Sequence, residues 1–167
     1  MVQWAHDHGL VALVTAHHAD DQAETMVMRL NRGAGLRGLA GMRPRTPLGY
    51  PPDTPLPLLR PLLRWRRSEL VEIVENAGII PVSDPSNNDL SFERVRIRDF
   101  MTSSNVLEIQ GFAASAQHLA DADLALDWAT DQLWTDVTPA ADGFTWNAPD
   151  HVPNALSLRV LERILHA

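Results

Sequence analysis

Residues 10–25 of this chain read Leu10-Val11-Ala12-Leu13-Val14-Thr15-Ala16-His17-His18-Ala19-Asp20-Asp21-Gln22-Ala23-Glu24-Thr25, and this stretch decides the fold. Its apolar beginning, residues 10–15, predicts a short strand covered on both faces, as in a parallel sheet. Two histidines follow at the carboxyl end of that strand, the edge where open α/β sheets bind ligands. We expect an amphipathic helix next, because apolar residues recur along one stripe at Ala23, Met26, Val27 and Leu30.

The predicted helix also carries a pair of carboxylates. Asp21 and Glu24 share one face with Thr25, because the three lie at i, i+3 and i+4. Paired carboxylates can hold an ammonium group, bind a divalent cation or act as a base. A simpler interpretation is helix capping, with Asp21 as the N-cap and Glu24 at N3. A metal site that also uses His17 and His18 is a further alternative, which we disfavour because nothing fixes a closed ligand set.

A glycine-rich segment follows the predicted helix. The run from Gly33 to Gly38 formally matches G-x-G-x-x-G, but it follows a helix, whereas a dinucleotide fingerprint follows a strand. Gly33 is better explained as the C′ glycine that ends the helix. The other glycines let the backbone turn tightly or approach a ligand closely.

Composition limits the class of protein. A chain of 167 residues with 45% hydrophobic residues is long enough for one domain, or one and a part. We see no signal peptide and no apolar run long enough to span a membrane. Cysteine is absent, which excludes disulfides and fits a cytoplasmic protein.

The charge is distributed unevenly along the chain. Residues 1–98 hold 12 arginines against 11 acidic residues, whereas residues 99–167 hold 2 arginines against 10 acidic residues. The overall net charge of -7 therefore does not argue against a nucleic-acid partner for the first part.

Prolines and periodicity predict the elements that follow. The proline-dense segment Arg43–Pro61 is expected to be an extended surface loop, with a short strand at Leu56–Leu59. A helix that ends at Gly78 comes next, and we expect another short strand at Ile79–Val82. The residues that this helix should bury are Leu70, Ile73, Val74 and Ala77.

The second half of the chain is expected to be mainly helical. From about Phe92 a helix presents Arg94 and Arg98 at i and i+4, with Arg96 turned elsewhere. After Asn105, apolar spacing predicts one long amphipathic helix. Residues 143–146 suggest a short strand, and Asn154 is expected to cap a last helix. The residues that this last helix should bury are Val160, Leu161 and Ile164.

Several motifs together resemble one family, the tRNA(Ile)-lysidine synthetases. The resemblance rests on residues 17–25, followed by residues 30–42, which read Leu30-Asn31-Arg32-Gly33-Ala34-Gly35-Leu36-Arg37-Gly38-Leu39-Ala40-Gly41-Met42. Arg60-Pro61-Leu62-Leu63, Asp84-Pro85-Ser86-Asn87 and the arginine-rich Arg94-to-Arg98 segment resemble further family motifs in the right order. Val95 departs from the pattern, in which asparagine is usual.

The resemblance implies a fold and an activity. The fold would be α/β, a partial Rossmann-like parallel sheet with helices followed by an α-helical domain. Residues 1–104 would be the carboxyl-terminal part of a PP-loop ATP-pyrophosphatase domain, and residues 105–167 a helical accessory domain. Family members use ATP and Mg²⁺ to adenylate the C2 oxygen of the wobble cytidine in tRNA(Ile). The ε-amine of free lysine then displaces AMP and leaves lysidine.

The resemblance also implies roles for individual residues. Catalysis is assigned to His18 and Asp21, and the binding of lysine to Asp21, Glu24 and Arg98. The partners are tRNA(Ile) and free lysine, with no membrane, and a homo-oligomer is compatible with the sequence. The residues assigned to the ATP or tRNA side are His17, Arg32, Gly33, Gly35, Arg94 and Arg96.

One family motif is not found. The ATP site of the family centres on a Ser-Gly-Gly-x-Asp-Ser loop, and this sequence contains none. We therefore expect an amino-terminally truncated fragment that is inactive alone. The alternatives are a non-catalytic remnant or binding module, or another tRNA-modifying ATP-pyrophosphatase.

Overall fold

The computed structural model describes residues 2–48, 56–82 and 84–167. The chain forms two compact units, Met1–Ala120 and Asp121–Ala167. The helix α6 (Ile109–Trp134) begins in the first unit and continues into the second. We describe each unit separately.

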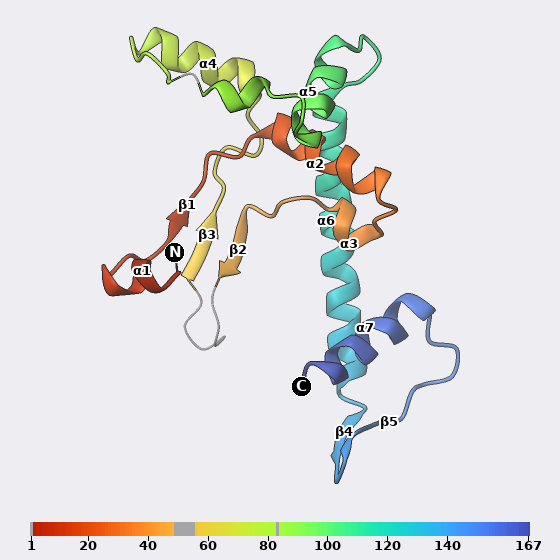
Figure 1. Ribbon diagram of the computed structural model, residues 1–167. Coiled ribbons are helices and arrows are strands. Elements are labelled where there is room, and N and C mark those ends of the chain that lie inside the picture. The colour runs from red at the N-terminus through yellow and green to blue at the C-terminus, as the bar shows by residue number, and fades with distance from the viewer. Residues whose placement is uncertain (1, 49–55, 83) are drawn as a thin grey trace. The chain divides into compact units, whose positions relative to one another are not determined.

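The first unit is built on a small mixed sheet with the order β1-β3-β2 (Figure 1). The strand β1 (Leu13–Val14) runs parallel to β3 (Leu56–Leu59), and β2 (Arg45–Leu48) is antiparallel to β3. The prediction of a strand after Leu10 and of another at 56–59 is confirmed. The first strand is shorter than expected, and Val11 and Val14 are exposed. Because these side chains are exposed, the prediction of a strand covered on both faces was wrong.

Strand β2 corrects the prediction of a loop from Arg43 onward. Its Pro47 lies opposite Pro57 of β3 in the antiparallel register. Antiparallel pairs alternate between hydrogen-bonded and non-hydrogen-bonded residues, and two prolines fit a non-hydrogen-bonded pair, where no N–H is needed. Proline therefore did not prevent a strand here.

Helices gather beyond the carboxyl edge of this sheet, where α2 begins (Figure 1). The core of the helical part contains Ala23 of α2, together with Ile97 and Met101 of α5, which packs against α2. Partly buried side chains from the start of α6 pack on the same core. The helices of this unit are α1 (Val2–Asp7), α2 (Ala19–Asn31), α3 (Leu36–Leu39), α4 (Arg67–Asn76), the 3₁₀ turn η1 (Pro85–Asn88) and α5 (Glu93–Ser103).

Helix α4 exists as predicted but does not bury the predicted stripe. None of its residues is fully buried, and Ile73 is half exposed. The segment Ile79–Val82 forms no strand, and Ile80 and Val82 are 91% and 95% exposed. A short apolar run does not by itself specify a strand, because pairing needs a partner edge, and none reaches this segment among the described residues.

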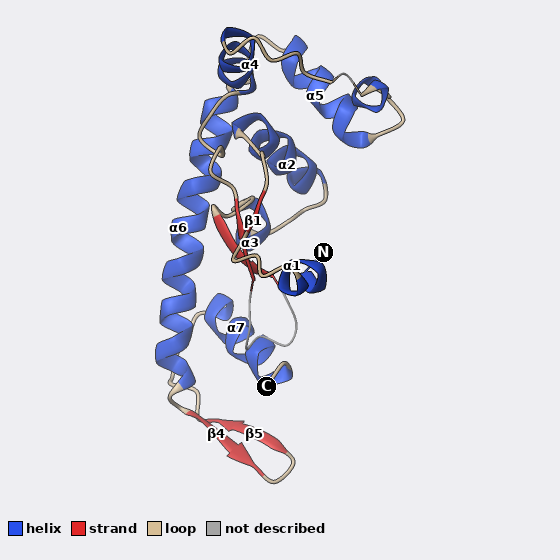
Figure 2. Cartoon of the chain, turned by 90° about the vertical axis from the view of Figure 1, so that its left-hand side faces the viewer, coloured by secondary structure: helices blue, strands red, loops and turns tan. Residues whose placement is uncertain are grey.

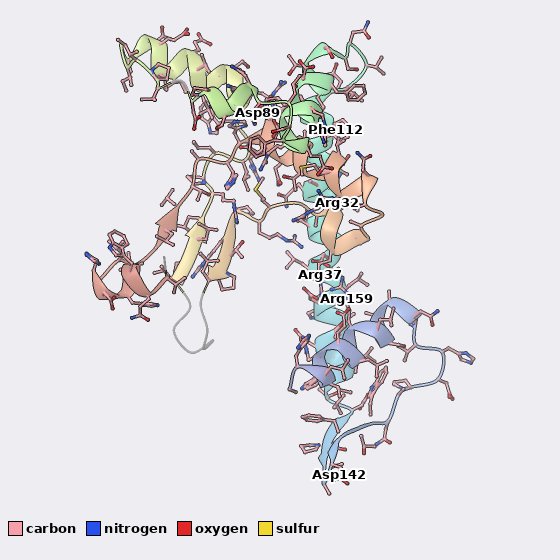
Figure 3. All side chains as sticks on the ribbon, viewed as in Figure 1. Arg32, Arg37, Asp89, Phe112, Asp142 and Arg159 are labelled. Atoms are coloured by element: carbon pink, nitrogen blue, oxygen red, sulfur yellow. The ribbon has the colours of Figure 1, made fainter. Side chains whose placement is uncertain are left out.

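The second unit combines the end of α6 with a hairpin and a last helix (Figure 2). The hairpin pairs β4 (Val137–Ala140) with β5 (Gly143–Trp146), and Asp142 lies at its turn (Figure 3). Helix α7 (Asn154–Leu165) buries Val160 completely, whereas Leu161 is half exposed. The long helix, the second hairpin strand and the last helix are confirmed, although Pro153 and not Asn154 is the N-cap. Among the described helices, none combines the length and the apolar character needed to cross a membrane.

Candidate active site at the carboxyl edge of the sheet

The amino terminus of α2 lies directly beyond the carboxyl end of β1. His18 is the N-cap: its backbone N–H donates to Asp21 Oδ2 at 2.9 Å, and its Nδ1 accepts from the Asp21 N–H at 3.4 Å. Asp21 therefore takes part in a capping box from position N3, one turn later than the N-cap position considered from the sequence. Capping occupies one oxygen of Asp21 and leaves Oδ1 for other partners.

Glu24 lies between two arginines. The residue is only 2% exposed, and it accepts hydrogen bonds from Arg94 Nε at 2.8 Å and Arg98 Nε at 2.6 Å. Arg94 Nη2 also lies 3.4 Å from Asp21 Oδ1 and from Thr25 Oγ1. Both predicted helix faces are confirmed. Asp21, Glu24 and Thr25 all lie within reach of Arg94, and Arg94 and Arg98 both donate to Glu24. Hydrogen bonding to Glu24 raises the pKa of Arg98.

Asp20 is a structural anchor that the sequence did not single out. Its carboxylate accepts from Arg66 Nε and Nη2, both at 3.2 Å, and from the Arg67 backbone N–H at 2.8 Å. Burial alone would raise the pKa of Asp20, but these hydrogen bonds outweigh burial and hold the pKa below its ordinary value. Asp20 thereby ties the start of α2 to the start of α4.

His17 is half buried between β1 and the charged cluster. Its Nδ1 lies 2.8 Å from Thr15 Oγ1. Burial lowers the pKa of His17; Asp21 acts to raise it, and the positive charges of Arg60 and Arg94 lower it further. The imidazole is therefore held in its neutral form at pH 7.

Arg60 belongs to the same edge, and sequence reasoning noticed its motif but not its role. It follows β3 directly, as His17 closely follows the parallel strand β1. Because the carboxyl ends of parallel strands share one edge of a sheet, these two side chains come together. From this rule, the sequence could have predicted that Arg60 lies at the same edge as His17.

The structure does not bring all predicted site residues to this edge. Arg32 follows the last turn of α2 and pairs with Glu93 (Figure 3). Arg32 follows Glu24 by eight residues, about 12 Å along the helix, and its partner Glu93 directly precedes Arg94 of the cluster. Gly33 has φ +67° after the C-cap, as predicted, and Gly35 is the N-cap of α3. Arg96 donates to the carbonyls of Leu90 and Ser91.

The glycine segment is fixed on the side of α2. The Gln22 side-chain amide donates to Met42 O at 2.8 Å and accepts from the Met42 N–H at 2.7 Å. Gly41 has φ +66°, and a Cβ there would lie 2.5 Å from Gln22 Oε1. Glycine is therefore required at this position by close approach and by backbone conformation.

The cavities near the cluster differ greatly in volume. Glu24 and Arg98 line a cavity of about 50 Å³, which has room for only a few water molecules. A larger cavity of about 730 Å³ opens between α4 and the α5–α6 connection, and no predicted site residue lines it. In the described part of the chain, no group of three or more His, Asp or Glu side chains is arranged to hold a metal ion.

This edge can recognise a ligand with charges of both signs. Two carboxylates, Asp21 and Glu24, offer sites for a cation, and the arginines offer sites for an anion. An amino acid and a phosphate ester are ligands that such an edge can hold.

The fold and this edge define an α/β protein of the nucleotide-hydrolase type, and comparison with known families agrees. Residues 1–105 match the model of the PP-loop domain, and the chain belongs to this family.

Its curated relatives are tRNA(Ile)-lysidine synthases. The chain is 62% identical over 157 residues to the enzyme of Novosphingobium aromaticivorans, covering 94% of the chain and 48% of that protein. It is 45% identical over 130 residues to the Zymomonas mobilis enzyme (78% and 39%), and 34% identical over 170 residues to the Ruegeria pomeroyi enzyme (99% and 39%). The predicted resemblance and α/β class are confirmed, and the chain spans about half or less of the length of these relatives.

Proposed function

We propose that this chain contributes to a tRNA(Ile)-lysidine synthase, which ligates free lysine to the wobble cytidine of tRNA(Ile) in the cytoplasm at the expense of ATP, with Mg²⁺ as a cofactor. The observation that carries the proposal is the similarity to curated tRNA(Ile)-lysidine synthases along 94% of the chain. The cluster at the sheet edge supports it, because a site for lysine needs charges of both signs. Residues 1–104 would form part of the catalytic domain and residues 105–167 a helical accessory domain.

Lysine would bind through its α-amino acid end. The α-ammonium group takes the carboxylates of Asp21 and Glu24, and the α-carboxylate takes Arg98. In this exchange the ammonium group replaces the Arg94 guanidinium at Glu24, and Arg98 pairs with the ligand carboxylate. The count of ion pairs is preserved, so the buried charge of Glu24 stays compensated.

The entry route follows from exposure. Glu24 is buried, and the cavity of about 50 Å³ that it lines is too small to hold lysine. Arg94 is 39% exposed and touches both carboxylates. Movement of Arg94 would open the carboxylates to solvent, and this makes Arg94 the gate of the proposed site.

The other end of lysine must stay reactive. The ε-amine attacks only as the neutral amine, so a carboxylate pair around it would be unproductive. His18 supplies an imidazole next to Asp21, and its Nδ1 is used in the helix cap, which leaves Nε2 for the substrate side. His17 and Arg94 would face the ATP or tRNA side, and Arg32, Gly33, Gly35 and Arg96 would act away from the lysine.

The test is the lysine affinity of Asp21→Asn, measured by calorimetric titration of lysine. Asparagine keeps an oxygen that accepts the His18 N–H, so the cap and the thermal midpoint should persist. Loss of one charge-assisted hydrogen bond should weaken binding by about 1.5–3 kcal/mol. Asp99→Asn, an exposed change on α5, is the matched control and should leave lysine binding unaltered.

A modified ligand separates recognition from nonspecific attraction. Nα-acetyllysine keeps the ε-amine but has no α-ammonium group, so it should bind weakly, and Asp21→Asn should not weaken it further. Equal binding of lysine by the wild type and Asp21→Asn, or loss of binding together with unfolding, would contradict the assignment.

A further inference from the structure

Arg60 occupies a fixed position at the sheet edge. Its backbone N–H donates to Pro44 O at 2.8 Å, and the preceding residue, Leu59, accepts from the Thr15 N–H at 3.0 Å. These two bonds link all three strands at the point where β1 and β3 end. The Arg60 side chain therefore starts from a rigid backbone, beside the histidines that follow β1.

The guanidinium of Arg60 is only partly satisfied. Its Nη1 donates to Arg43 O and to Thr46 Oγ1, each at 2.9 Å. Its Nε is buried and meets no acceptor in the part of the chain that the structure describes. No carboxylate pairs with Arg60 within residues 2–48, 56–82 and 84–167, so its charge is balanced only by neutral acceptors.

Two other arginines of this unit show what the Nε side of a guanidinium group binds in this protein. Arg66 uses Nε and Nη2 to hold the carboxylate of Asp20, and Arg98 uses the same two nitrogens to hold Glu24. The side-on pair of N–H donors matches two oxygens of a carboxylate or phosphate. In Arg60 this pair of donors includes the buried, unsatisfied Nε.

The charge of Arg60 reaches His17. Burial lowers the pKa of that imidazole, the negative charge of Asp21 raises it, and the positive charges of Arg60 and Arg94 lower it further. Burial lowers the pKa of Arg60 itself, yet an arginine stays charged in proteins. A buried cation without an anionic partner carries a desolvation cost, which a bound anion would offset.

We propose that the Nε side of Arg60, at the end of β3 beside His17, binds a phosphate group. This rests on the proposed function only for the source of the phosphate, which is either the nucleotide or the tRNA backbone. A phosphate offers more oxygens than a carboxylate, so it can accept from the Arg60 guanidinium and keep oxygens for further donors. The bonds from Nη1 to Arg43 O and Thr46 Oγ1 hold the fork in place for this ligand.

The competing explanation is that Arg60 only fastens strand β2 to β3. The variants Arg60→Gln and Thr46→Val separate the two. A glutamine amide can still donate to Arg43 O but carries no charge and no Nε, whereas Thr46→Val removes one acceptor of the fastening and keeps the guanidinium. Phosphate binding should fall at least tenfold in Arg60→Gln and stay within about twofold in Thr46→Val.

The experiment is a titration followed by the arginine Nε–Hε signals in ¹⁵N NMR spectra. Inorganic phosphate, AMP and an RNA anticodon stem-loop are the three probes, and the signal absent from Arg60→Gln identifies Arg60. We expect a saturable shift of that signal with phosphate, and none for Arg96, whose guanidinium donates to Leu90 O and Ser91 O. AMP binding more tightly than the stem-loop would identify the nucleotide as the source; the reverse would identify the tRNA backbone.

The proposal is overturned if no probe shifts the Arg60 signal, or if Arg60→Gln keeps wild-type phosphate affinity. It is equally overturned if Thr46→Val loses phosphate binding as fully as Arg60→Gln, because fastening then explains both. Asp21→Asn should leave the phosphate shift intact. Asp21→Asn therefore tests lysine binding and Arg60→Gln tests phosphate binding, so failure of one proposal can be told from failure of the other.

Discussion

Two clusters of ion pairs in this chain are mirror images in charge. At the sheet edge one buried carboxylate, Glu24, lies between Arg94 and Arg98. In the second unit one guanidinium, Arg159, pairs with Asp123 and Asp127 of α6. Each cluster joins two helices through one central charge held by two opposite charges.

The surroundings of the two clusters differ. Arg159 is 10% exposed and Asp123 is 6% exposed, so this pair is closed to solvent, whereas the outer partner Asp127 is 45% exposed. The sheet-edge cluster is open at Arg94 and continues into His17 and Arg60. The same chemistry therefore fastens a helix pair in one unit, and in the proposed function it exchanges partners with lysine in the other.

The largest effect is expected at the closed cluster. Arg159→Met leaves the buried carboxylate of Asp123 without its guanidinium, which should lower the stability of the second unit by about 3 kcal/mol. Amide hydrogen exchange of α7 measures this unit separately from the first. Arg163→Met is the matched control: its partner Asp131 is 59% exposed, so the loss should stay below about 1 kcal/mol.

A double variant tests whether the closed cluster only fastens helices. Asp123→Leu combined with Arg159→Met replaces the charges by apolar groups, which often restores stability. We expect at least half of the loss to be recovered. No recovery would mean that the cluster specifies the helix pairing in a way that apolar packing cannot replace.

A smaller effect is expected at the open cluster. Glu24→Gln should lower the stability of α2, measured by hydrogen exchange, by about 2 kcal/mol, because Arg94 and Arg98 can turn partly toward water. The change also removes one negative charge from the sheet edge, so inorganic phosphate should bind more tightly. A loss equal to that of Arg159→Met, or weaker phosphate binding, would remove the distinction between the clusters.

The sequence predicted the local part of the open cluster. Helical periodicity placed Asp21, Glu24 and Thr25 on one face and Arg94 and Arg98 on another, and both faces are as predicted. It could not show that these faces meet, because the pairing joins residues separated by 70 or more positions. Sequence reasoning thus identified the charged side chains but not their partners. It assigned Glu24 to the binding of lysine, although Arg94 and Arg98 already donate to this carboxylate.

The errors have the same non-local origin. The apolar run Ile79–Val82 has strand composition but no paired edge in the described structure, whereas Arg45–Leu48 contains a proline and still pairs. Strand formation depends on register with a neighbour, and Pro47 is accommodated because a non-hydrogen-bonded position opposite Pro57 needs no N–H donor. Arg60 escaped notice for the same reason, since its importance arises from the parallel pairing of β1 and β3.

The smallest expected effect is the titration of His17. Burial lowers the pKa of His17, opposed by Asp21 and reinforced by Arg60, Arg94 and His18. Below pH 6.5 the unfolded chain binds a proton that folded His17 takes up only at lower pH. Folding stability from this group is therefore complete above pH 6.5 and is lost as the pH falls toward the folded pKa.

The measurement compares wild type with His17→Asn, which can still reach Thr15 through its side-chain amide. Exchange of the α2 amides should become faster in wild type between pH 7.5 and 5.5, after correction for intrinsic exchange, and less so in His17→Asn. His118→Gln, an exposed change on α6, should behave as wild type. Added phosphate should reduce the wild-type slope, because an anion beside Arg60 favours the charged imidazole. An unchanged slope in His17→Asn would show that the cations of the open cluster do not act on this histidine, and the continuity from Glu24 to Arg60 would fail.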